Sequence, residues 1–313
     1  MREHPRFELQ VGDCRNIQDV VKAVRGVDAV LHLAAIVGDP ACAQEPESAL
    51  ETNYAATRML VEVAKGHGVA RFVFASSCSV YGATSVEVDE KSATKPVSLY
   101  GQTKVDSEQV VLQARDDRFH TTVLRFATVF GLGRRPRFDL VVNLLTAKAS
   151  TEGLITIFNG AQWRPMIHVR DVVEATVRVI EAPVRLVSGE VFNVGDSRLN
   201  YTLSGIAEAI REVFPNTRVE YHDNEDKRDY RVSFEKIRRT LAFEAAHTLR
   251  DGIDELKRAF EEGVITNYQD LRYHNQRFLQ ASGSIGHKDE LDGPLMAAFA
   301  AHLERASRPA AAL

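Results

Sequence analysis

The segment Arg71-Phe-Val-Phe-Ala-Ser-Ser77 is an apolar run of strand length that ends in two serines. Further along the chain comes Tyr100-Gly-Gln-Thr-Lys104, in which the tyrosine and the lysine are four positions apart. Positions i and i+4 share one face of a helix, with Cβ atoms roughly 6 Å apart, so an ammonium can lie beside a phenol and stabilise its phenolate. The pattern predicts a buried strand that brings Ser77 close to a proton-transfer pair, Tyr100 and Lys104.

The surrounding pattern has to support this reading, because a Tyr-x-x-x-Lys spacing also arises by chance on solvated helix faces. Strand-length apolar segments alternate with segments of helical period through the first two thirds of the chain, which predicts a parallel sheet covered by crossover helices. The predicted strands are 7–11, 29–33, 72–75, 122–126 and 191–194, and the predicted helices are 17–24, 47–67, 99–114 and 169–181.

The pattern loosens after residue 131, where a polar loop at 131–137 precedes a short predicted helix at 140–149. A helix at 203–213, a strand near 218–221 and a mostly helical stretch at 245–279 then predict a smaller α+β portion. We expect residues 1–130 and 166–196 to form a dinucleotide-binding domain and residues 131–165 and 197–280 a substrate-binding portion. Residues 281–313 are interpreted as a tail.

Composition restricts the partners and the location. The formal net charge is −4, which gives no basic surface for nucleic acid. No apolar run reaches the roughly 18 residues of a membrane span. The three cysteines are few, odd in number and without metal-ligand spacing, so we expect a reduced cytoplasmic setting and no metal.

Several motifs follow one another in a fixed order along the chain. They are Gly12-Asp13-x-Arg15, Leu31-His-Leu-Ala-Ala35, Asn53, Ser76-Ser-Cys-Ser-Val-Tyr-Gly82, Tyr100-x-x-x-Lys104, Leu124-Arg-Phe-Ala-Thr-Val-Phe-Gly131, Arg164-Pro-Met-Ile-His-Val-Arg-Asp171 and Phe192-Asn-Val-Gly195. This series resembles the extended short-chain dehydrogenase/reductase family, in its nucleotide-sugar epimerase and dehydratase branch. The resemblance implies a Rossmann-like doubly wound sheet, NAD as cofactor with NADP not excluded, a nucleotide-diphosphate sugar as substrate, and a homodimer formed through helices 47–67 and 99–114.

The resemblance also assigns roles to single residues. Tyr100 would be the acid/base, Lys104 would lower its pKa and bind the nicotinamide ribose, and Ser77 would share the substrate proton. The implied cofactor-binding residues are Asp13, Cys14, Leu33, Ala34, Ala35, Asn53, Ala75, Tyr100, Lys104 and Phe126. The implied substrate-binding residues are Ser77, Cys78, Ser79, Thr128, Asn143, Arg164 and Arg228.

Several of these residues have a structural alternative. Ala34 and Ala35 are explained equally well by core packing. Asn53 may be read either as a residue that holds backbone near the active site or as a solvated helix residue. The two arginines, Arg164 and Arg228, suit a diphosphate because planar guanidinium groups match phosphate oxygens, but they can also form ordinary surface ion pairs.

The chain departs from the family pattern at its beginning. It contains no Gly-x-x-Gly-x-x-Gly fingerprint, whose amides and helix N-terminus hold a dinucleotide pyrophosphate. We therefore expect about two strands and two helices of the family fold to be missing. A start placed too late is the preferred explanation over a naturally shortened silent protein or a partner that supplies the missing half.

The residues after Ser77 bear on the reaction. Family dehydratases carry an Asp-Glu pair there, whereas this chain has Cys78 and Ser79. The expected activity is therefore an NAD(P)-dependent nucleotide-sugar epimerisation at C4 through a transient keto-sugar. The alternatives are a keto-sugar reductase or dehydrogenase of the same family and a catalytically silent binding protein.

Overall fold

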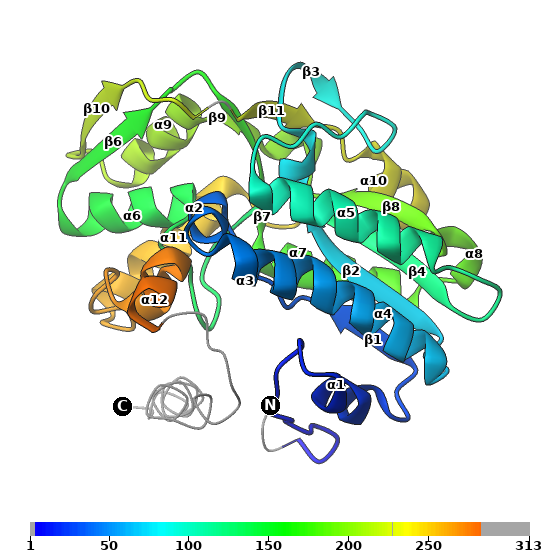
Figure 1. Cartoon of the computed structure of the whole chain (residues 1–313). Coiled ribbons are helices and arrows are strands. Elements are labelled where there is room, and N and C mark those ends of the chain that lie inside the picture. Colours follow the sequence, from blue (N-terminus) through cyan, green and yellow to red (C-terminus); the bar gives the residue numbers. More distant parts are fainter. Residues whose placement is uncertain (1–3, 227, 283–313) are drawn as a thin grey trace.

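The central feature of the structure is a parallel sheet of four strands. The computed structural model describes residues 4–226 and 228–282. The strands are β1 (Ala29–His32), β2 (Arg71–Ser77), β4 (His120–Phe126) and β8 (Glu190–Val194), and they lie in the order β1-β2-β4-β8. Every neighbouring pair is parallel, with Phe74 of β2 opposite His32 and Val123, for example. Parallel neighbours require crossover connections, and helices provide them (Figure 1).

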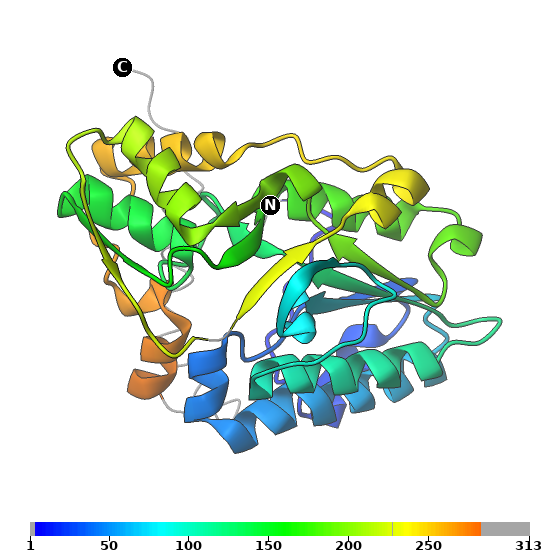
Figure 2. The same cartoon turned by 90° about the horizontal axis from the view of Figure 1, so that it is seen from above.

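Helices cover both faces of this sheet. On one face, α1 (Ile17–Val24), α4 (Ala56–Gly66) and α5 (Leu99–Gln113) pack on Phe72 and Phe74 of β2. On the other face, α7 (Val169–Glu181) packs on Val73 and Phe192. Figure 2 shows α4 and α5 on one side of the strands and α7 on the other. Because both faces are buried, β2 is apolar almost throughout, and the predicted doubly wound α/β fold is confirmed.

The predicted strand at 7–11 is wrong. Residues 7–11 have no strand assignment, and Phe7, Leu9 and Val11 are exposed. Alternating apolar residues form a strand only where a neighbouring strand completes the hydrogen bonds, and no strand of the described chain pairs with this segment.

The helix α5 begins where a side chain satisfies its first amides. The hydroxyl of Ser98 accepts a hydrogen bond from the backbone N–H of Gly101, 3.2 Å away. This N-cap fixes the first turn of the helix, which contains Tyr100. The predicted boundaries of α5 were correct at its start and one residue too long at its end.

The predicted helix at 47–67 is divided into three parts. It consists of α3 (Pro46–Leu50), a π-helical turn at Glu51–Ala55 and α4. A π turn inserts one residue into the helical repeat and commonly marks a functional site. Here the turn contains Asn53, whose side chain is buried.

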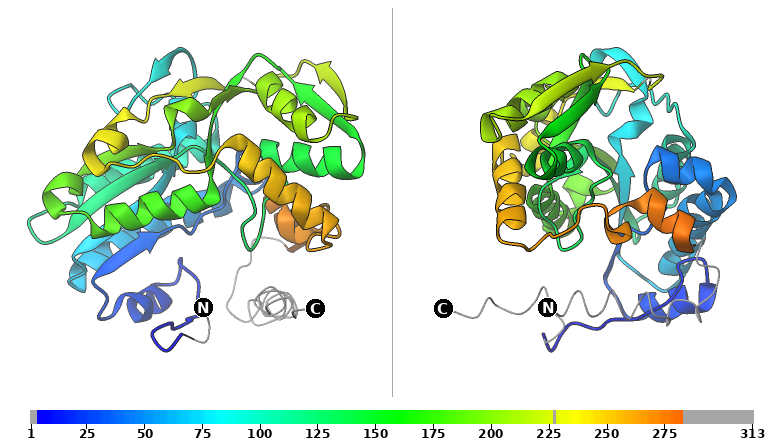
Figure 3. Two further views of the ribbon diagram at one scale, coloured as in Figure 1. Left: turned by 180° about the vertical axis from the view of Figure 1, so that it is seen from behind. Right: turned by 90° about the vertical axis from the view of Figure 1, so that its left-hand side faces the viewer.

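The remaining elements form a second body beside the sheet, visible in both panels of Figure 3. Its core joins α6 (Val141–Thr151), α9 (Leu203–Val213) and α11 (Leu249–Glu261) with apolar side chains of two strand groups. One group pairs β6 (Leu154–Phe158) with β10 (Arg218–His222) in parallel. The other contains β5 (Thr128–Phe130), β7 (Trp163–His168) and β9 (Asn200–Thr202).

The outer connections complete the described chain. A parallel pair of β3 (Ala83–Val88) and β11 (Asp229–Val232) lies beyond the sheet. The other helices are α2 (Asp39–Gln44), α8 (Val184–Val187), α10 (Glu235–Leu241) and α12 (Asn275–Ser282), with single 3-10 turns at Cys78–Tyr81, Ser197–Leu199 and Leu271–Tyr273. Residues 4–226 and 228–282 contain no helix that is long and apolar enough to cross a membrane. The predicted tail, apart from residues 281 and 282, lies outside the described residues.

Candidate active site

A cavity of about 690 Å³ lies where the carboxyl ends of β2 and β4 meet α6 and β6. Its wall combines residues from the sheet with residues from the second body, as expected for a site at the strand ends of an open α/β sheet. Eleven of the predicted site residues line it: Leu33, Ala75, Ser77, Ser79, Tyr100, Lys104, Phe126, Thr128, Asn143, Arg164 and Arg228.

Ser77 and Tyr100 meet in this wall. Ser77 ends β2, and its hydroxyl donates to the hydroxyl of Ser79 at 3.0 Å and forms a side-chain hydrogen bond with Tyr100. Tyr100 is buried in the first turn of α5. The structure therefore brings together, in the wall of one cavity, a serine and a tyrosine that are far apart in the sequence.

Lys104 is buried one turn after Tyr100. Its Nζ donates to the carbonyl of Ala75 at 2.8 Å and lies 4.8 Å from the centroid of the Phe74 ring and 5.8 Å from that of Tyr100. Within the described part of the chain it has no ion-pair partner. Burial lowers the pKa of Lys104 to about 8, because a charged ammonium loses its hydration there.

The effect of Lys104 on the pKa of Tyr100 stays a prediction, and other groups also act on this phenol. Burial is the largest influence on Tyr100, and it raises the pKa of the phenol above its ordinary value. The hydroxyl of Ser77 and the guanidinium of Arg137 act in the opposite direction and lower that pKa. Arg137 is thus a positive charge near the phenol that the sequence did not predict.

A buried ion pair supports this wall from behind. Arg125 of β4 donates two hydrogen bonds to the carboxylate of Glu108, which lies one turn beyond Lys104 on α5. The hydroxyl of Ser76, next to Ser77, donates to the same carboxylate at 2.5 Å. Charge-assisted bonds of this kind in a buried setting fix geometry, so the end of β2 and the face of α5 that carries Lys104 are held together.

Four predicted cofactor residues at the N-terminal side, Asp13, Cys14, Ala34 and Ala35, do not line the cavity. The carboxylate of Asp13 is occupied by the guanidinium of Arg15, with its closest oxygen 2.6 Å from Nη2. Cys14 is partly buried, and burial raises the pKa of its thiol. Ala34 is exposed, so core packing does not account for its small size, and Ala35 next to it is half-buried.

Asn53 does not line the cavity, but it holds backbone beside it, as one of its two predicted readings has it. It is buried away from the cavity wall, accepts from the backbone N–H of Ile36 at 2.7 Å and donates to the carbonyl of the same residue at 2.9 Å. A second donor bond reaches Thr103 on α5. Asn53 therefore fixes the backbone that follows β1, and the reading as a solvated helix residue is excluded.

Cys78 does not contact the cavity, which corrects its predicted role in substrate binding. Its side chain is buried and its thiol donates to the carbonyl of Arg125 at 3.3 Å. Burial raises the pKa of this thiol far above its ordinary value, so it has no thiolate to offer as a base at neutral pH.

The predicted diphosphate ligands lie in the wall, already paired with carboxylates. Arg164 donates to the carboxylate of Asp226 at 3.2 Å and to the backbone carbonyl of Arg228. Arg228 pairs with Asp226 at 2.6 Å and with Asp39 at 3.0 Å. Asn143 lines the same cavity, where its amide accepts from the N–H of Gly131 and holds a loop that has a positive φ of 96° at that glycine.

Sequence reasoning missed several residues of the wall. Asp39, Asp226 and Tyr230 line the cavity, as do Arg135 and Arg137 from the loop at 131–137. The two loop arginines had a signal, since they lie in the polar loop predicted at 131–137. Asp39 and Asp226 belong to no sequence motif that would have identified them. Their place in the site follows from their ion pairs with Arg164 and Arg228.

Comparisons with known proteins agree with this geometry. The model of a family described as the NAD dependent epimerase/dehydratase family matches residues 2–195. A Bacillus subtilis (strain 168) protein named "Uncharacterized UDP-glucose epimerase YtcB" is 27% identical over 242 residues, which cover 75% of this chain and 75% of the relative. The UDP-glucose 4-epimerase of Lactobacillus helveticus is 26% identical over 228 residues, 67% of this chain and 69% of the relative.

A solved structure shares the same fold. MoeE5 in complex with UDP-glucuronic acid and NAD superimposes with a TM-score of 0.72 at 29% sequence identity. The match covers 80% of this chain and 85% of that chain.

Proposed function

Since this chain belongs to the NAD dependent epimerase/dehydratase family, we propose that it is an NAD-dependent epimerase that inverts C4 of a nucleotide-diphosphate sugar. The observation that carries the proposal is the convergence of Ser77, Tyr100 and Lys104 with two arginines in the wall of one cavity. The hydroxyl-bearing groups suit proton transfer, and Arg164 and Arg228 suit a diphosphate.

The residues present fit a dinucleotide at the sheet side of this cavity. An ammonium has three N–H donors, and Lys104 uses one of them for the carbonyl of Ala75. The other two are available for ribose hydroxyls. Leu33, Ala75 and Phe126 supply apolar wall beside it. NAD held there would supply hydride transfer, as acceptor from the sugar carbon and as donor back to its opposite face.

The chain's own residues would handle the proton. Oη of Tyr100 takes the proton of the 4-hydroxyl as the ketone forms and gives it back as the ketone is reduced. Oγ of Ser77, which is already hydrogen-bonded to Tyr100, holds the sugar oxygen in line with it. Burial opposes the base form of Tyr100 by raising the pKa of the phenol, and the positive charge of Arg137 and the hydroxyl of Ser77 favour it by acting in the opposite direction.

The same geometry argues against elimination chemistry. A 4,6-dehydration needs a second acid and base beside the hydroxyl group. Cys78 is buried outside the cavity, and Ser79 carries no charge. Removal of a hydride and its return therefore accounts for the groups that are present.

We further propose a homodimer formed through α4 and α5, which pack side by side on one face of the sheet, and a cytoplasmic location. The helical pairing is implied by the family resemblance. The location is supported by the three cysteines, which are all free.

The test is turnover with UDP-glucose and with UDP-glucuronate in the presence of NAD. Formation of the 4-epimer, followed by proton NMR, without net NADH supports the epimerase. Stoichiometric NADH with a keto-sugar product would instead establish a dehydrogenase. Ligand binding by calorimetry with no product of either kind would make the chain a binding protein.

A further inference from the structure

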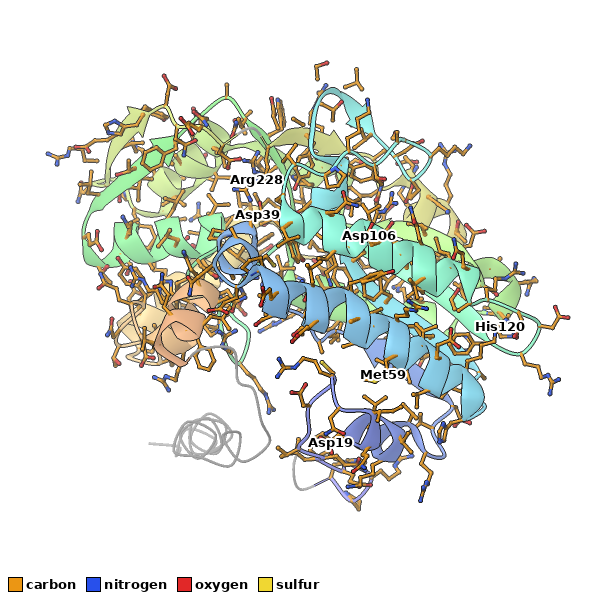
Figure 4. The ribbon with its side chains drawn as sticks, in the orientation of Figure 1. Asp19, Asp39, Met59, Asp106, His120 and Arg228 are labelled. Atoms are coloured by element: carbon orange, nitrogen blue, oxygen red, sulfur yellow. The ribbon has the colours of Figure 1, made fainter. Side chains whose placement is uncertain are left out.

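Arg228 forms an ion pair that spans the cavity wall. Its Nη1 lies 3.0 Å from Oδ2 of Asp39, the first residue of α2. Arg228 comes from the segment before β11, so the pair connects two parts of the chain that are remote in sequence. Figure 4 shows the labelled side chains of Asp39 and Arg228 next to each other between α2 and the second body.

The charges around Arg228 balance one another. Arg228 also pairs with Asp226 at 2.6 Å, and Arg164 pairs with Asp226 at 3.2 Å. Two guanidinium groups are therefore paired with two carboxylates, which compensate their charge. A diphosphate that enters the cavity meets arginines whose charge is already compensated, and one carboxylate has to give way to it.

Asp39 is the carboxylate that can be replaced. Asp226 lies two residues before Arg228, and its carboxylate accepts two hydrogen bonds from that guanidinium. Asp226 and Arg228 therefore move together. Asp39 contributes a single ion pair and is held from its own side, because Ser98 donates to its Oδ1 at 2.7 Å. Ser98 is the N-cap of α5, the helix that carries Tyr100.

We propose that Asp39 competes with the diphosphate of the nucleotide sugar for Arg228 and thereby sets how tightly the nucleotide is held. This inference rests on the proposed function for the identity of the ligand. Without ligand, Arg228 is paired with Asp39. When the ligand binds, the guanidinium leaves Asp39 and pairs with the phosphates. Asp39 is thus a positioning residue that keeps product affinity low enough for release.

The experiment measures UDP binding by calorimetry to the full chain, to Asp39→Asn, to Arg228→Gln and to the double variant. Asparagine keeps the shape of Asp39 and an oxygen for Ser98, and it removes only the charge. A half-buried ion pair that still meets solvent has a modest strength, so Asp39→Asn should bind UDP about three- to fivefold more tightly. In the Arg228→Gln background the same substitution should change the affinity less than twofold, roughly the limit for uncoupled sites.

Asp139→Asn is the matched control. Asp139 lines the same cavity, pairs with Arg137 at 2.9 Å and is as exposed as Asp39, with side-chain values of 23% and 22%. Asp139→Asn changes the electrostatic potential of the cavity without releasing Arg228. Any gain in UDP affinity that it causes should therefore persist in the Arg228→Gln background. Melting curves show whether each variant is folded. If Asp39→Asn is not folded, Asp39→Ser removes the same charge and replaces it in the experiment.

The outcomes separate the two proposals. Unchanged or weaker UDP binding by Asp39→Asn would overturn the competition, and so would a gain that survives in Arg228→Gln. If the unmodified chain does not bind UDP, that result contradicts the part of the proposed function that assigns a nucleotide as ligand. Inorganic pyrophosphate then serves as the probe in the same cycle, and a gain on Asp39→Asn that depends on Arg228 still supports the competition.

Discussion

Replacement of Lys104 by methionine should change how the stability of the protein depends on pH. The ammonium is 3% exposed and is surrounded by the Phe74 ring, the Ala75 carbonyl and the Tyr100 ring. Burial lowers the pKa of Lys104 from 10.5 to about 8. Methionine has a similar length and no proton to lose, so the variant isolates this ionisation.

The magnitude follows from the difference between the folded and unfolded pKa values. Between pH 8 and 10.5 the unfolded chain binds more protons at this lysine than the folded chain, so wild-type stability rises with pH in that window. Below pH 8 both states carry the proton, and the folded state bears the full penalty. Integration from pH 7 to pH 10 gives a gain of about 2.5 kcal/mol for wild type relative to Lys104→Met.

The assay is urea unfolding of both proteins without ligand at pH 7 and at pH 10. Other titrating groups cancel in the difference between the two proteins. Repetition in a Tyr100→Phe background removes the neighbouring phenol and should give the same gain. A difference that stays constant within about 0.5 kcal/mol between the two pH values would refute the reasoning, because Lys104 would then titrate as it does in the unfolded chain.

Three further results are expected. Tyr100→Phe should lower the epimerisation rate by roughly 100-fold or more, since acid–base catalysis contributes at least that much, and more than a tenth of the wild-type rate would remove Tyr100 from the mechanism. The 313-residue chain should bind NAD more weakly than about micromolar, because its sequence has no glycine fingerprint to hold the pyrophosphate; calorimetry that finds micromolar affinity would show that the groups beside Lys104 suffice. Light scattering should give the mass of a dimer at micromolar concentration, and a monomer would count against pairing through α4 and α5.

The parts of the fold that sequence predicted are those with a local signal. The apolar run of β2 and the helical periods of α1, α7 and α9 depend on neighbours in sequence, and the predicted bounds of those three helices agree with the structure. The segment 7–11 has the same kind of signal without a partner strand, and there the prediction failed. The short strands β5, β9 and β11 were missed because three or four residues carry too little periodicity.

The site residues that belong to sequence motifs were predictable. Properties that depend on burial, and contacts between residues that are distant in the sequence, were not. Ser77, Tyr100 and Lys104 converge as predicted. The pKa of Tyr100 depends on its burial, and no spacing of residues in a sequence reveals that. Asp39 and Arg228 are far apart in the sequence, so the position of one residue does not predict that it pairs with the other.

The π-helical turn at Glu51–Ala55 makes the spacing of this part of the chain intolerant of change in length. An α-helix advances about 100° per residue, so loss of one residue from the turn would rotate Asn53 relative to one of its flanking helices. The amide would then face away from Ile36, although every side chain of α4 could keep its place against the sheet. A single-residue deletion here would leave the helix intact and uncouple the loop after β1 from α5, so the length of this turn is itself under constraint.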